Sequence, residues 1–277
     1  MIVGETIISR LVVWVYYLFG QWPNENSSLL YYIFSFILHF GFVFLYLICM
    51  LINLIFITDV NETTHSLYVT LTELAFFLKV MNFFWFNRGM KECMSAVVGF
   101  ELKSDDEAKW IRKRMHHFNW LTYAYYIIPN ICAITASMRP LFIAQRDVPF
   151  RGWYPLDWVN SDSSYTLVYA YQVIGIMIEV NLNITLDVYP NYLMHMISIE
   201  MEILGKRLTN LGLSSNKVIR IIDPSDAYQR KGVSDLVDCI KTHQKIIRLF
   251  ISPTDCIPSL VADKLFDRTE ECSHFLA

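Results

Sequence analysis

Long apolar runs with few or no charged residues alternate along the chain with shorter segments that carry most of its charged side chains. Four runs are long enough to cross the hydrocarbon core of a bilayer, which is about 30 Å thick and needs about 20 helical residues. They cover residues 29–57, 66–86, 118–138 and 165–186. Open strands cannot satisfy their backbone hydrogen bonds in lipid. The pattern therefore predicts an all-α fold, a polytopic membrane helical bundle with four membrane spans.

The distribution of basic residues predicts how these spans are oriented. The segment between the second and third spans carries seven Lys or Arg residues, whereas residues 58–65 carry none. Many more Lys and Arg residues follow the fourth span, and the loop that precedes this span has only three. Because basic residues concentrate in cytoplasmic loops, both ends of the chain are expected inside the cell. The aromatic segment 150–158 is then expected outside.

The same pattern divides the chain into four regions. Residues 1–28 form an expected cytoplasmic amino-terminal segment, and residues 29–187 form the four-span region. Residues 188–250 repeat apolar side chains at helical spacing, which predicts a cytoplasmic helical region. Residues 251–277 contain prolines and acidic side chains without a further apolar run, and we expect them to be disordered.

Composition supports a membrane protein and argues against several other classes. Hydrophobic residues make up 54% of the chain and charged residues 18%, whereas a soluble domain carries about 25% charged residues. The net charge of −3 lacks the basic excess that a nucleic-acid partner would require. No glycine-rich phosphate loop, H-E-x-x-H or G-x-S-x-G motif is present, so we expect neither an enzyme nor a cofactor. The cysteines form no C-x-x-C pair, so no metal site is expected.

Polar and aromatic side chains in the outer halves of spans two, three and four predict a ligand pocket. Apolar and aromatic walls with a few hydroxyl, amide or carboxyl groups suit a small, mostly apolar ligand. Ordinary helix packing is the alternative explanation for each residue taken alone. Lys79 is six residues from Glu73 and points about 120° away around the helix, so a direct pair between them is doubtful. The candidate pocket residues are Tyr68, Thr72, Glu73, Phe76, Tyr126, Asn130, Ile134, Tyr169, Val173 and Met177.

Two features are expected on the outer side. Asn61 begins an N-x-T sequon in the first outer loop and is a candidate for glycosylation. The segment "FRGWYPLDW" concentrates Trp153, Tyr154 and Trp158 between prolines that oppose helix formation. These rings are expected either to anchor the loop at the headgroup level or to cover the mouth of the pocket as a lid.

Several motifs in register resemble the insect odorant receptors. They are "LFGQWP" at 18–23, "VPFRGWYPLDW" at 148–158, the start of span four at "YTLVYAYQVIG", and "DCIKTHQKIIRLF" at 238–250. The resemblance extends over roughly residues 14–250. It implies a seven-helix subunit of a ligand-gated cation channel that forms a hetero-tetramer with a common co-receptor. It also implies a pocket for small volatile odorants, contact with membrane lipid, and a multi-pass protein in the cell membrane of sensory neuron dendrites.

The family pattern stops after Phe250, before the membrane part of helix five and helices six and seven. Because the seventh helix lines the pore in this family, we expect the chain to be incomplete at its carboxyl end and not to conduct alone. Two other classes stay open at this point. A gustatory receptor shares the inverted seven-span design, and a four-span structural membrane protein would need no further spans.

Overall fold

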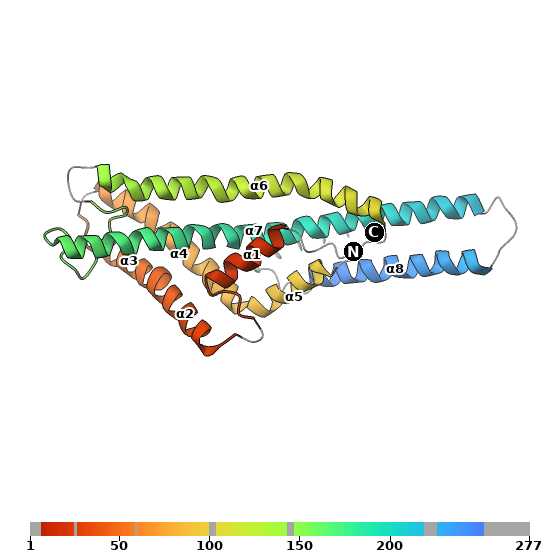
Figure 1. Cartoon of the computed structure of the whole chain (residues 1–277), viewed down its shortest axis with the longest axis horizontal. Coiled ribbons are helices and arrows are strands. Elements are labelled where there is room, and N and C mark those ends of the chain that lie inside the picture. Colours follow the sequence, from red (N-terminus) through yellow and green to blue (C-terminus); the bar gives the residue numbers. More distant parts are fainter. Residues whose placement is uncertain are drawn as a thin grey trace, which may run out of the picture. The chain divides into compact units, whose positions relative to one another are not determined.

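The computed structural model describes residues 7–24, 27–58, 60–99, 104–142, 147–218 and 226–251, and every regular element in them is helical (Figure 1). The prediction of an all-α fold is therefore confirmed for this part of the chain. The elements are α1 (Ile7–Leu18), α2 (Leu29–His39), a short π-helix η1 (Phe40–Phe44), α3 (Leu45–Phe56), α4 (Val60–Trp85), α5 (Asn87–Val98), α6 (Asp105–Met138), a 3₁₀ turn η2 (Arg139–Phe142), α7 (Asp162–Val218) and α8 (Asp226–Ile251).

Three helical stretches in the described residues are long and apolar enough to cross a membrane. They are Leu29–Phe56, Glu62–Trp85 and the apolar part of Asp162–Leu211. The predicted third span, residues 118–138, is helical throughout and its helix continues past Pro129. It is missing from the three stretches because its Tyr, Thr and Asn side chains lower its mean hydropathy.

The helices divide between two compact units. The first, which we call the bundle unit, comprises Ile7–Trp85 and Phe118–Tyr189. Its core joins Val43 of η1, Phe76 and Val80 of α4, and Leu182 of α7. Within this unit α3 packs against α4. Large apolar side chains also cover its outer surface and include Leu29, Leu30 and Phe36 on α2. Exposed apolar area on this scale marks a surface that meets lipid or another protein.

Helix α1 packs into the bundle unit, although its 12 residues are too short to cross a bilayer. Tyr16 is completely buried and donates a hydrogen bond to the Thr185 carbonyl at 3.1 Å. Its ring lies 5.8 Å from that of Trp22 and 4.4 Å from that of Phe83, with Tyr189 5.9 Å away. These aromatic contacts tie the amino-terminal segment to α4 and α7.

The "GQWP" turn after α1 depends on a glycine. Gly20 has φ +78°, in the left-handed region that side chains disfavour. A Cβ atom there would lie 2.7 Å from Ser35 Cβ and 2.8 Å from Ser35 Cα. Ser35 Oγ donates to the Gly20 carbonyl at 2.7 Å, and Gln21 contacts His39 at 3.3 Å. The turn therefore allows the backbone of Gly20 to lie directly against α2.

The second unit, which we call the α8 unit, contains α5, residues 105–117 of α6, residues 190–218 of α7, and α8. Arg207 forms a two-pronged ion pair with Glu107, with both nitrogen–oxygen distances at 2.7 Å. Lys206 Nζ lies 3.5 Å from the centre of the Trp110 ring, and Arg114 pairs with Glu202 at 3.2 Å. The polar contacts between α6 and α7 in this unit are therefore dominated by Arg and Lys.

Replacing Arg207 by Lys should lower the thermal midpoint of the purified protein by a few degrees. Only 15% of the Arg207 side chain and 19% of that of Glu107 are exposed, so screening by water is limited. Lysine keeps the charge but cannot make the parallel hydrogen bonds of a guanidinium, and about 1 kcal/mol is the expected loss. Lys206→Arg, at a more exposed neighbouring position, is the control. Equal midpoints for both variants would contradict the two-pronged pair.

Candidate functional site

The loop before α7 is held by one buried side chain of that helix. Gln172 has no exposed surface. Its Oε1 accepts a hydrogen bond from the Phe150 N–H at 3.0 Å, and its Nε2 donates to the Phe150 carbonyl at 2.8 Å. The same Nε2 donates to Tyr154 Oη at 2.8 Å. A single amide thus satisfies the backbone of Phe150 and fixes the ring of Tyr154 against α7.

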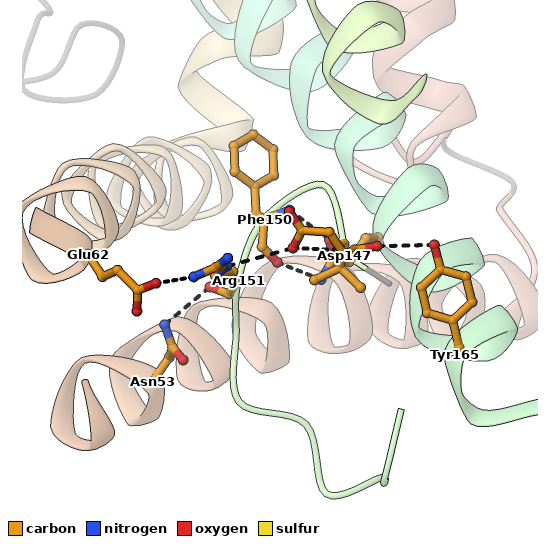
Figure 2. Close-up of polar contacts among 8 residues, drawn as sticks. Asn53, Glu62, Asp147, Phe150, Arg151 and Tyr165 are labelled. Carbon is orange, nitrogen blue, oxygen red and sulfur yellow. Dashed lines mark hydrogen bonds and ion pairs between the residues drawn. The ribbon is translucent and has the colours of Figure 1, made fainter. Parts of the chain in front are cut away.

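The opposite side of this loop is joined to α3 and α4. Figure 2 shows Arg151 between Glu62 of α4 and Asp147 of the loop itself. The Arg151 carbonyl accepts from Asn53 Nδ2 of α3 at 3.2 Å, and the Trp153 N–H donates to the Cys49 carbonyl, also at 3.2 Å.

These contacts on the α3 and α4 side are easier to release than those made by Gln172. The side chains of Arg151 and Glu62 are 58% and 49% exposed, and ion pairs so exposed contribute about 0–1 kcal/mol. At the start of α7, Tyr165 Oη donates to the Asp147 carbonyl at 3.1 Å (Figure 2).

The three aromatic residues predicted in this loop have different surroundings. Tyr154 points inward, with its ring 6.3 Å from that of Tyr171, and burial raises the pKa of its hydroxyl. Trp153 is 40% exposed and Trp158 is half-buried. Gly152 leaves room for the inward ring, because a Cβ atom there would lie 3.1 Å from Tyr154. The segment therefore contributes one ring to the interior of the bundle unit and presents another at its surface.

Two predicted pocket residues of α6 contact α7. Tyr126 Oη and Thr185 Oγ1 are 2.8 Å apart. Asn130 and Asn181 exchange two amide hydrogen bonds, at 3.2 and 3.1 Å. Both contacts lie in the half of α6 that was predicted to span the membrane. Hydrogen bonds between amide and hydroxyl side chains are a common means of joining helices in lipid.

The predicted residues of α7 line the same helix but differ in their partners. Tyr169 Oη donates to the Ser137 carbonyl of α6 at 2.8 Å. Val173 and Met177 are half-buried. Asn181 Nδ2 donates to the Met177 carbonyl at 2.8 Å, within α7.

The other predicted residues are not brought together. Phe76 is buried in the core of the bundle unit and Glu73 is half-buried, whereas Thr72 is exposed and Tyr68 is 70% exposed. Ile134 on α6 is 49% exposed. A helix turns by about 100° per residue, so each step of four residues moves about 40° around the axis. Tyr68 and Phe76 are therefore about 80° apart and face different surroundings.

Two carboxyl groups meet inside the bundle unit. Glu73 of α4 and Glu179 of α7 lie within hydrogen-bonding reach of each other, and Glu179 is only 6% exposed. Tyr46 of α3 lies near both, and its hydroxyl is buried. Lys79 does not pair with Glu73, because it binds Asp187 at 2.7 Å.

Gln172, Tyr46 and Tyr171 were not among the residues predicted for this region from the sequence. Gln172 and Glu179 are seven residues apart, a spacing that places both on one face of a helix. This spacing, and the presence of an acidic residue in a run that is otherwise uncharged, could have indicated from the sequence that Gln172 and Glu179 face the interior together. The predicted sequon residue Asn61 lies in the first turn of α4, and its side chain falls outside the described ones. No group of three or more potential metal ligands occurs among the residues that the structure describes.

Comparison with known proteins places this arrangement in one family. Residues 59–261 match the family described as 7tm odorant receptor. Odorant receptor 94a of Drosophila melanogaster is 26% identical over 76% of this chain and 57% of its own length. Odorant receptor Or1 of Anopheles gambiae is 24% identical over 70% of this chain and 48% of its own length. The chain thus spans about half to three fifths of the length of these relatives.

A solved structure shares the fold. The insect olfactory receptor OR5 from Machilis hrabei superposes with a TM-score of 0.72 at 15% identity, over 88% of this chain and 63% of that one. The same receptor has been solved in complex with eugenol, with a TM-score of 0.71. The family match extends over most of the chain and distinguishes it from gustatory receptors and from structural membrane proteins. This chain belongs to the insect odorant receptor family, whose members are multi-pass membrane receptors rather than enzymes.

Proposed function

We propose that this chain binds small volatile odorants in the bundle unit, beneath the loop that Gln172 holds. The family match over residues 59–261 carries this proposal. The complex of the OR5 receptor with eugenol, a small aromatic molecule, supports it through the shared fold. The ligand would contact the half-buried and buried members of the predicted set, namely Glu73, Phe76, Tyr126, Asn130, Tyr169, Val173 and Met177. Tyr154 would cover this region from the loop.

Binding would be converted into a signal by a larger assembly. We propose that the receptor acts as a subunit of a cation channel, gated by odorants and assembled with the odorant receptor co-receptor as a hetero-tetramer. The amino terminus would lie in the cytoplasm and the 147–161 loop outside, in the cell membrane of a sensory neuron dendrite. The distribution of basic residues supports this orientation. A ligand can gate only by binding the open state more tightly than the closed one.

Odorant binding can be measured directly on the chain reconstituted in lipid nanodiscs. Tyr169→Phe removes the hydroxyl that contacts Ser137 but keeps the ring, so affinity should change less than threefold. Phe76→Ala empties part of the core beside the proposed pocket, so affinity for eugenol and a panel of small volatiles should fall by tenfold or more. Saturable binding of at least one volatile to the unmodified chain is expected. Its absence across the panel would contradict the proposed function.

A further inference from the structure

The pair of carboxyl groups inside the bundle unit has no positive partner in the part of the chain that the structure describes. Two carboxyl groups this close together share one proton, because like charges at short range repel, which leaves the pair with up to one negative charge. Across the described residues, no Lys, Arg or His side chain forms an ion pair with Glu73 or Glu179. The nearest cation along α4, Lys79, is bound to Asp187 and Asn183 instead. A buried negative charge ordinarily requires a compensating partner.

Two buried oxygen atoms in this cluster also have no hydrogen-bond partner among the described side chains. Glu179 Oε1 is enclosed and makes no hydrogen bond. The Tyr46 hydroxyl, on a side chain that is 2% exposed, makes none either. Both groups lie close enough to interact electrostatically with each other and with Glu73. Buried polar atoms are normally satisfied, so this convergence of acceptors indicates a place for a donor from outside the described residues.

The rings around these oxygens favour an organic cation. The Tyr46 and Tyr171 rings lie 6.3 Å apart, the Tyr154 ring lies 6.3 Å from Tyr171, and Phe42 stacks on Tyr171 at 5.3 Å. Aromatic faces attract ammonium groups, and enclosed tyrosines are a common frame for them. Sodium or calcium would instead require several oxygen ligands on all sides, of which this cluster supplies few.

We infer that Glu73, Glu179 and Tyr46 bind the ammonium group of a small protonated amine, with its carbon skeleton among the tyrosine rings. The inference rests on the proposed function, because it names the chemical class of the ligand for that site. A primary ammonium carries three N–H donors, which match the two carboxyl groups and the hydroxyl. The Tyr154 ring, fixed by Gln172, would close the site on the side of the loop.

Paired ligands that differ only in this group test the inference. 2-Phenylethylamine and 2-phenylethanol have the same skeleton, and their binding to the whole chain in neutral lipid nanodiscs can be measured at pH 7. The amine should bind at least tenfold more tightly. Glu179→Gln should remove this preference, with the affinity for the amine falling by tenfold or more. Tyr46→Phe should weaken amine binding several-fold, since it keeps the ring and removes only the hydroxyl.

Two further variants control for charge loss elsewhere on the chain and for a failure of Glu179→Gln to fold. Glu92→Gln removes an exposed acid of α5 and should leave both affinities unchanged. Glu73→Gln tests the same site from α4 if Glu179→Gln does not fold. Equal affinities for the amine and the alcohol, or an amine preference that survives both glutamine variants, would overturn the inference and leave the proposed function intact. Failure of every volatile to bind would overturn both.

Discussion

Replacing Gly20 by Ala should lower the thermal midpoint of the receptor by about 10 °C, or prevent its recovery from the membrane. A residue with a side chain at φ +78° carries strain of about 1–3 kcal/mol. The new Cβ would also lie under 3 Å from the backbone and side chain of Ser35, so α2 or the turn must move. The two effects together should cost on the order of 3 kcal/mol, a large share of the 5–15 kcal/mol that ordinarily separates folded from unfolded chains.

Gly41 offers a matched control for this substitution. It lies in η1 of the same unit, and a Cβ atom there meets no atom within 4 Å. Gly41→Ala should therefore leave the midpoint unchanged or raise it slightly, because alanine restricts the unfolded chain. Fluorescence-detected size-exclusion chromatography after a temperature series would measure both variants in detergent. Similar losses for the two substitutions would show that the contact between Gly20 and Ser35 does not support the fold.

The sequence predicted the helices better than it predicted their contacts. Apolar runs with few charged residues locate α2, α3, α4 and the first part of α7, because burial in lipid demands a continuous apolar helix. The proline-rich segment 149–155 was expected to interrupt helix formation, and it lies in the loop. Helix α1 was missed because it is too short for a span, and its burial depends on aromatic partners distant in sequence, such as Tyr189.

The candidate site could be predicted only in part, for a geometrical reason. Spacing along one helix defines a face, but it does not define which face of a neighbouring helix it meets. The contacts of Tyr126 and Asn130 with α7 depend on the rotation of both helices, which intrahelical periodicity leaves open. The same freedom explains why Tyr68 proved exposed, and why Glu73 meets Glu179 rather than Lys79.

Replacing Gln172 by Met should detach the loop before α7 from the bundle unit. Methionine has a similar length and fills the buried space, but it offers no strong donor or acceptor. The Phe150 N–H, the Phe150 carbonyl and the Tyr154 hydroxyl would lose their partners together. Each such loss costs about 1–3 kcal/mol while the group stays buried, so the loop should move to where water can satisfy it. We expect the thermal midpoint to fall by several degrees and amide exchange across residues 148–154 to rise at least tenfold.

The same variant distinguishes a lid from an anchor. If the loop covers the ligand, Gln172→Met should speed both association and release of a bound volatile, because the loop then keeps only its contacts with α3, α4 and the start of α7. If Trp153 only anchors the loop at the membrane surface, ligand kinetics should stay as in the unmodified chain while exchange increases. Gln244→Met, at an exposed position of α8, controls for the chemistry of the substitution. Unchanged exchange in Gln172→Met would contradict the role of this amide, whereas faster exchange with faster ligand release would identify the loop as a lid whose closed state depends on one buried glutamine.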